Sequence, residues 1–87
     1  MNDVIKRMSV ITGFDESDII SDFRYSEYVE IRRVCAWILR KEMTSSRAGR
    51  ILNRTHATVL YSEQKVNDLI SINDSLTLDL ILKFYTF

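Results

Sequence analysis

Proline is absent from this chain of 87 residues, and glycine occurs only at Gly13 and Gly49. These two residue types most often interrupt regular structure and form the turns between strands. Their scarcity argues against a fold of many short strands. The chain is therefore predicted to be all-α, a bundle of about six helices joined by tight turns. Its length suits a single domain spanning residues 1–87.

Cysteine and histidine occur once each, at Cys35 and His56. One cysteine cannot form a disulfide within the chain, and no further cysteine or suitably spaced carboxylate completes a metal site around His56. The sequence also lacks a glycine-rich phosphate loop and a nucleophile paired with a base. We therefore expect no enzyme activity, no metal, no cofactor and no bound nucleotide. Cys35 is interpreted as a small core residue.

Long apolar runs are missing as well, because no stretch approaches the ~20 residues that a membrane-spanning helix requires. The first residues, Met1 to Arg7, have mixed charge and lack both the apolar stretch and the cleavage site of a signal peptide. These features predict a cytoplasmic protein without a membrane partner.

Apolar residues recur at helical spacing through most of the chain. The clearest stripe is formed by Ile31, Val34, Cys35, Ile38 and Leu39, and it predicts one long helix. Residues that favour helix ends divide the remainder, and for the tail we prefer a helix over a strand. The expected helices cover residues 2–12, 15–22, 26–43, 44–52, 55–70 and 73–87.

The net charge is zero, but the basic residues are concentrated in the middle of the chain. Screening confines the field of a charge to roughly 10 Å at 0.1 M salt, so a polyanion responds to the local charge. Charge alone also allows an ordinary solvated helix face. Between positions 32 and 54 the only acid is Glu42, and the bases are Arg32, Arg33, Arg40, Lys41, Arg47, Arg50 and Arg54.

Residues 44–62 have the layout of a helix-turn-helix, with a short helix, a tight turn and a longer helix. In that motif the start of the second helix reaches the edges of the bases. Here it begins Arg54-Thr55-His56-Ala57-Thr58. A guanidinium, two hydroxyls, an imidazole and a methyl group suit phosphates, purine acceptors and the thymine methyl. The layout alone is weak evidence, since many helical bundles contain such a turn.

The stretch from Ala48 to Val66, AGRILNRTHATVLYSEQKV, resembles the signature of the C-terminal duplex-DNA-binding domain of the bacterial replication initiator DnaA. The resemblance extends over residues 2–70, with residues 73–87 as an additional C-terminal helix. It implies an all-helical bundle with a helix-turn-helix, of the DnaA C-terminal or Trp-repressor type. It also implies a double-stranded DNA partner, a bacterial or phage source and association with the nucleoid.

The same resemblance implies roles for individual residues. Ser45, Ser46 and Arg47 correspond to positions that meet phosphate or the groove wall, and Arg32 and Arg33 are minor-groove or backbone candidates. The base-reading positions are Arg54, Thr55, His56, Ala57 and Thr58.

Several positions depart from the family pattern. Thr55 stands where the family usually has Asp, and Ala57 where it has Ser, Thr or Pro. The turn before Arg54 is one residue shorter, and the link to the Thr44 helix about three residues shorter. Ile31-Arg32-Arg33 matches the family's Arg-Pro-Arg only loosely. Because these changes touch base-reading positions and leave the scaffold intact, we expect DNA binding to be retained and recognition of the initiator's usual origin boxes to be in question.

Two hypotheses follow. The first is a stand-alone duplex-DNA-binding protein that regulates replication or transcription. The alternative is a protein-interaction adaptor that kept the fold and lost DNA. Convergence of Arg32, Arg33, Arg47 and Arg54 beside the start of the second motif helix would favour DNA. Dispersal of these arginines, or their pairing with Glu27, Glu30 and Glu42, would favour the adaptor. The apolar tail is interpreted either as a helix that closes the bundle or as a surface for a homodimer or partner protein.

Overall fold

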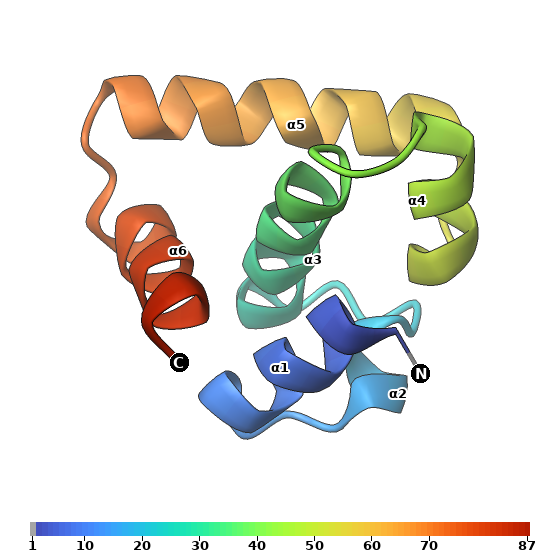
Figure 1. Ribbon diagram of the computed structural model, residues 1–87, viewed down its shortest axis with the longest axis horizontal. Helices are drawn as coiled ribbons and strands as arrows, with labels where there is room; N and C mark the ends of the chain where they lie inside the picture. The colour runs from blue at the N-terminus through green and yellow to red at the C-terminus, as the bar shows by residue number, and fades with distance from the viewer. Residues whose placement is uncertain (1) are drawn as a thin grey trace.

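Six α-helices make up the fold in a computed structural model that describes residues 2–87 (Figure 1). Those residues contain no strand, so the all-α expectation is confirmed. The helices are α1 (Asp3–Thr12), α2 (Glu16–Ile19), α3 (Ser26–Leu39), α4 (Ser45–Leu52), α5 (His56–Ser71) and α6 (Ser75–Thr86).

The helix starts follow the capping residues that the sequence offers. Thr44, Thr55 and Asp74 precede α4, α5 and α6. The side chain of each accepts a hydrogen bond from the backbone N–H three residues later, at 3.3, 3.2 and 3.0 Å. These bonds satisfy N–H groups that the first turn of a helix leaves without partners. The predicted boundaries of α4 and α5 are therefore correct to within one residue.

Two helices, α2 and α3, are each four residues shorter than predicted, and α6 is three residues shorter. α3 ends at Leu39 rather than residue 43, because Lys41 and Glu42 donate to the carbonyls three residues earlier and tighten the chain into a turn. The Arg40 guanidinium closes this turn on the Met43 carbonyl at 3.0 Å. α2 ends at Ile19 rather than residue 22. The carbonyls of Ile19 and Ser21 instead accept hydrogen bonds from an arginine of α3.

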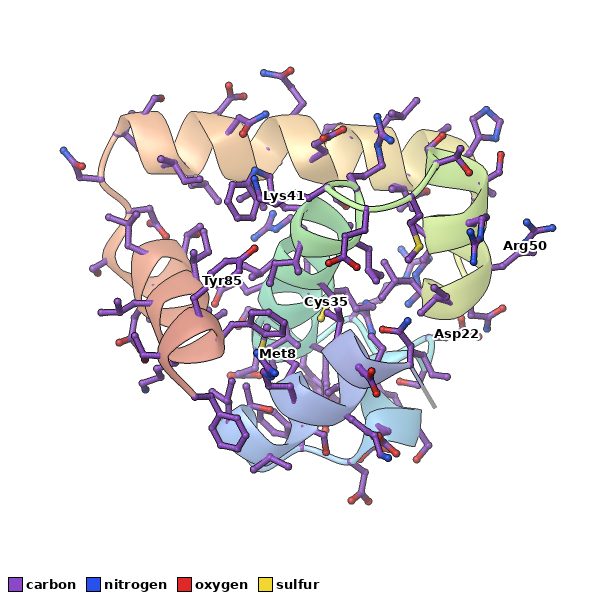
Figure 2. All side chains as sticks on the ribbon, viewed as in Figure 1. Met8, Asp22, Cys35, Lys41, Arg50 and Tyr85 are labelled. Atoms are coloured by element: carbon purple, nitrogen blue, oxygen red, sulfur yellow. The ribbon has the colours of Figure 1, made fainter. Side chains whose placement is uncertain are left out.

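α3 lies at the centre of the bundle and packs against each of the other five helices (Figure 1). Met8 and Cys35 lie in this core (Figure 2). Burial raises the pKa of Cys35 to about 12, which suits the predicted role of a core residue. The full set of buried apolar residues is Ile5, Met8, Ile19, Ile31, Val34, Cys35, Ala36, Ile38, Leu39, Ala48, Leu52, Val59, Val66 and Phe84.

The last helix, α6, closes the bundle and also exposes apolar side chains. Its inner side, with Phe84 buried and Leu80 and Ile81 partly buried, packs on the core. The predicted bundle-closing role is thus confirmed, whereas a dimer or partner contact stays a prediction. No helix within residues 2–87 is both long and apolar enough to cross a membrane. The exposed apolar residues of α6 are Leu76, Leu78, Leu82 and Tyr85, and the exposed Phe87 follows the helix.

Candidate nucleic-acid interface

α4 and α5 pack against each other and are joined by a tight turn at the end of the molecule opposite α6 (Figure 1). Asn53 ends α4 in the left-handed conformation, at φ 57°. The Arg54 N–H then donates to the Gly49 carbonyl at 2.8 Å. A Cβ at position 49 would lie 2.5 Å from the Arg54 carbonyl oxygen, so only glycine allows the turn to lie this close to α4.

The first turn of α5 presents small polar groups to solvent. Thr55, His56, Ala57 and Thr58 are exposed, and Val59 behind them is buried. The Thr55 and Thr58 hydroxyl oxygens lie 3.0 Å apart, so one hydroxyl donates to the other. The buried Val59 fixes the helix, while the predicted base-reading residues from Thr55 to Thr58 remain free to contact a ligand.

Arg54 lies at the junction between this turn and the loop that follows α2. Its guanidinium donates to the carbonyls of Leu52 and Asn53 at 3.4 and 2.9 Å, and also to the carbonyl of Ser21. The side chain is half-buried. Arg54 therefore helps to hold the two segments together as well as contributing positive charge beside α5.

Arg32 is placed differently from the expectation. Its side chain is only 7% exposed, and its guanidinium donates to the carbonyls of Ile19 at 3.2 Å, Ser21 at 3.0 Å and Phe23. Burial lowers the pKa of Arg32, and the positive charge of Arg54 adds to this effect. This placement does not support a direct contact with a DNA groove. Arg32 instead anchors the segment between α2 and α3.

Arg33, one residue later, faces another part of the bundle. Hydrogen bonds from the Thr77 backbone and hydroxyl lower the pKa of Asp74 at the start of α6, and the Arg33 charge lowers it further. The half-buried Arg33 therefore acts on α6, at the opposite end from the α4–α5 turn. The structure brings Arg32 and Arg54 together and leaves Arg33 apart, so the predicted arginines converge only in part, and the position of Arg33 is one that favours the adaptor hypothesis.

The first turn of α4 holds the remaining predicted residues. Ser46 and Arg47 are exposed, and Ser45 is half-buried beside the Thr44 cap. Arg50, on the next turn, extends away from the protein (Figure 2). Neither α4 nor α5 carries an acidic residue at its cap or in its first turn, whereas the other four helices each have one. An approaching anion therefore meets no local carboxylate at these two starts.

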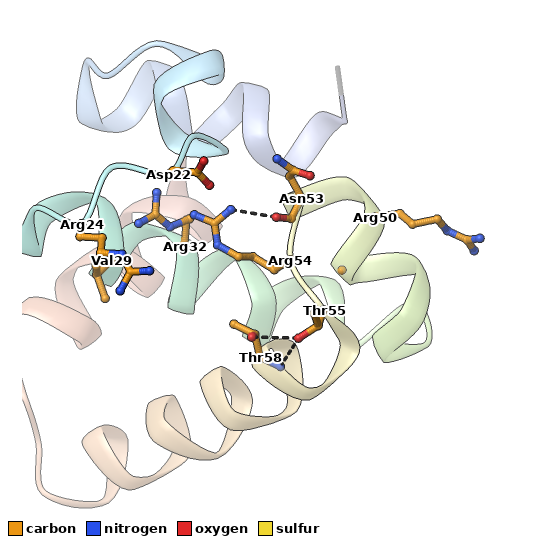
Figure 3. A pocket seen from close by; sticks show the side chains of 10 residues that line it. Asp22, Arg24, Val29, Arg32, Arg50, Asn53, Arg54, Thr55 and Thr58 are labelled. Carbon is orange, nitrogen blue, oxygen red and sulfur yellow. Dashed lines mark hydrogen bonds between the residues drawn. The ribbon is translucent and has the colours of Figure 1, made fainter.

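A pocket of about 780 Å³ opens between the segment after α2 and the α4–α5 turn (Figure 3). It includes Arg24, which the sequence analysis missed because this residue lies outside the basic segment of residues 32–54. Its position between two aromatic residues, in an otherwise acidic stretch, was the available signal. The lining residues are Asp22, Arg24, Val29, Arg32, Gly49, Arg50, Asn53, Arg54, Thr55 and Thr58.

Ion pairs do not neutralise these arginines. The two pairs within residues 2–87 join Arg40 to Glu63 at 3.2 Å and Lys83 to Asp79 at 3.0 Å. The acids that would have favoured the adaptor hypothesis, Glu27, Glu30 and Glu42, take part in neither. The same part of the chain contains no cluster of three or more residues able to hold a metal ion.

No protein-family model matches the sequence, but individual proteins do. The chain is 37% identical over 60 residues to the chromosomal replication initiator protein DnaA of Mycoplasma pneumoniae, which covers 67% of this chain. It is 35% identical over 65 residues to the DnaA of Mycoplasma genitalium, which covers 72%. The matched stretches span only 14% and 15% of those initiators. The resemblance read from the sequence is confirmed, and the chain is a DnaA-like domain.

Proposed function

We propose that this domain binds duplex DNA through α4 and α5. The first turn of α5 enters the major groove, where His56 and Thr58 face acceptors on the bases and Ala57 meets the thymine methyl. The observation that carries this proposal is the exposed first turn of α5, with three polar side chains and the methyl group of Ala57, beside a pocket whose arginines are not paired with acids.

The first turn of α4 supplies the contacts to the DNA backbone. Ser46 and Arg47 are exposed there, and the unpaired backbone N–H groups at a helix start favour phosphate. Arg32 supports this interface from behind rather than touching DNA, and Arg33 lies outside it. The relatives are named as initiators of chromosome replication, so the process we assign is control of replication.

Fluorescence anisotropy with labelled duplexes tests this proposal. His56→Ala and Arg47→Gln each remove an exposed side chain, and we expect each to weaken binding by about 1–3 kcal/mol. Arg47→Gln should also reduce the dependence on salt by about one phosphate, whereas His56→Ala should not. Lys6→Gln, exposed on α1, is the matched charge control and should bind as the wild type does.

The same titrations separate the two hypotheses. Initiator-box and random duplexes are compared over a salt series, so that a preference for the box would show that Thr55 and Ala57 still permit its recognition. No binding to any duplex at low salt, by a protein with an intact helical spectrum, would overturn the DNA proposal. That result would leave the adaptor hypothesis, with the exposed apolar side of α6 as its first contact surface.

A further inference from the structure

The pocket between the α2–α3 segment and the α4–α5 turn gathers three guanidinium groups. Arg32 and Arg54 lie next to each other, and Arg24 stands on the side of the α2–α3 segment (Figure 3). Arg50 lines the same pocket, but its side chain extends away from the other three (Figure 3). The one acidic residue in the lining is Asp22.

Two of these arginines donate hydrogen bonds to the same backbone carbonyl. The Ser21 carbonyl accepts a hydrogen bond from Arg32 at 3.0 Å and another from Arg54. Each bond satisfies one N–H group of a guanidinium ion, but a carbonyl is neutral and leaves the positive charge uncompensated. Like charges this close repel, and they persist only where surrounding structure or an opposite charge holds them.

The lowered pKa of Arg32 reflects burial and the same excess of positive charge. Burial lowers its pKa most, the charge of Arg54 lowers it further and Arg24 contributes in the same direction, while Asp22 alone opposes them. Asp22 and Arg24 are both exposed and take part in neither ion pair of residues 2–87. An anion that entered the pocket would relieve this repulsion, and Arg24 is free to turn onto it.

We infer that this pocket is a phosphate-binding site, with Arg24 and Arg54 as the groups that contact the phosphate oxygens. Arg32 and the Ser21 carbonyl hold Arg54 in place, and the Thr55 hydroxyl lies at the rim. Guanidinium groups match phosphate oxygens in geometry as well as in charge. If the ligand is a phosphodiester of the DNA backbone, the inference rests on the proposed function. Free phosphate has the same chemistry.

The first experiment uses inorganic phosphate alone. Backbone amide NMR follows a phosphate titration against sodium chloride of equal ionic strength and pH. We expect saturating shifts at residues 21–25 and 53–55. Arg24→Gln should weaken this binding by about fivefold or more, since it removes a charged donor, and Asp22→Asn should tighten it. Arg50→Gln removes the same charge from the same lining, and we expect a change below about twofold.

Asp22→Asn guards against a trivial explanation, because a gain of affinity cannot come from a misfolded variant. Equal weakening by Arg24→Gln and Arg50→Gln would indicate a general charge effect and overturn the inference. The absence of saturable shifts, in phosphate that leaves the protein folded, would overturn a free-phosphate site, and the DNA experiment then decides whether the pocket takes a phosphodiester.

The second experiment uses duplexes in which one phosphate at a time is replaced by a neutral methylphosphonate. At one position the replacement should weaken the wild type but not Arg24→Gln, and Arg24→Gln should lower the salt slope by about 1. Phosphate binding without DNA binding would keep the pocket and overturn the proposed function. DNA binding without such a coupled position, together with no phosphate binding, would overturn the pocket and keep the proposed function.

Discussion

The turn before α5 and the turn before α6 are built in the same way. Asn53 and Asn73 adopt left-handed conformations, at φ 57° and 58°. The next residue in each turn donates its N–H to a carbonyl five residues earlier, Arg54 to Gly49 at 2.8 Å and Asp74 to Leu69 at 2.9 Å. This pairing is one of the common hydrogen-bonded ways to end a helix, and asparagine tolerates its left-handed position.

The two turns differ in what surrounds them. The first has Gly49 where the second has Leu69, so the turn itself does not require glycine. Gly49 is needed because the Arg54 carbonyl lies against it. The first turn leads to a neutral cap, Thr55, and the second to a carboxylate cap, Asp74. The same local motif thus precedes two different helix starts. The start of α5 is open to anions, whereas the start of α6 already carries a negative charge.

The largest expected effect comes from placing a methyl group at the first turn. Gly49→Ala puts a Cβ 2.5 Å from a backbone oxygen, so α4 and the start of α5 must separate. Although alanine has the better helix propensity, we expect a loss of about 1–3 kcal/mol in the free energy of unfolding. Urea denaturation measures it, and a variant as stable as the wild type would show that the close approach is dispensable.

Exchanging the first cap should change DNA binding more than stability. Thr55→Asp keeps an acceptor for the Thr58 N–H, so unfolding should shift by no more than about 0.5 kcal/mol. The new carboxylate adds negative charge where α5 would enter the groove, and we expect affinity for random duplex to fall by about 0.5–1 kcal/mol. Because the family usually has Asp at this position, affinity for the initiator box should fall less. Anisotropy titration measures this change. Unchanged affinity would mean that the start of α5 does not approach phosphate.

The smallest effect is expected at the second cap. The Thr77 backbone and hydroxyl lower the pKa of Asp74, so this carboxylate stabilises the fold fully above its ordinary pKa. Its contribution is lost as the pH falls through the lowered value. Asp74→Thr should therefore reduce the melting temperature near neutral pH, and the difference from the wild type should narrow in acid. Duplex binding should stay the same, which makes this variant the control for Thr55→Asp.

Local features of the fold could be predicted from the sequence, and features that depend on distant contacts could not. Thr44, Thr55 and Asp74 start helices because a cap acts within three residues. Neighbouring arginines in one helix point about 100° apart, so Arg32 and Arg33 necessarily face different surroundings. Nothing in the local pattern says which one is buried, because the carbonyls that hold Arg32 lie 9, 11 and 13 residues away.

The site was predictable to a similar extent. The motif and its spacing predict that residues 55–58 begin the second helix, and they are exposed at the start of α5. Their contact with DNA stays a prediction. Arg24 joins the same pocket only because the segment after α2 folds back onto the α4–α5 turn. The sequence singles out Arg24 as a basic residue in an acidic stretch, but only tertiary packing brings it beside the α4–α5 turn.

The shared Ser21 carbonyl links two segments that are distant in the sequence. A fluctuation that swings this peptide plane outward breaks one hydrogen bond of Arg32 in α3 and one of Arg54 before α5 in the same event. Local opening around α2 and loosening at the start of α5 are then coupled, so the free energy of one opening includes a contribution from the other. A ligand that immobilises Arg54 would therefore also slow hydrogen exchange at amides near Ser21. Hydrogen exchange at the end of α2 would therefore report whether a ligand is bound beside Arg54.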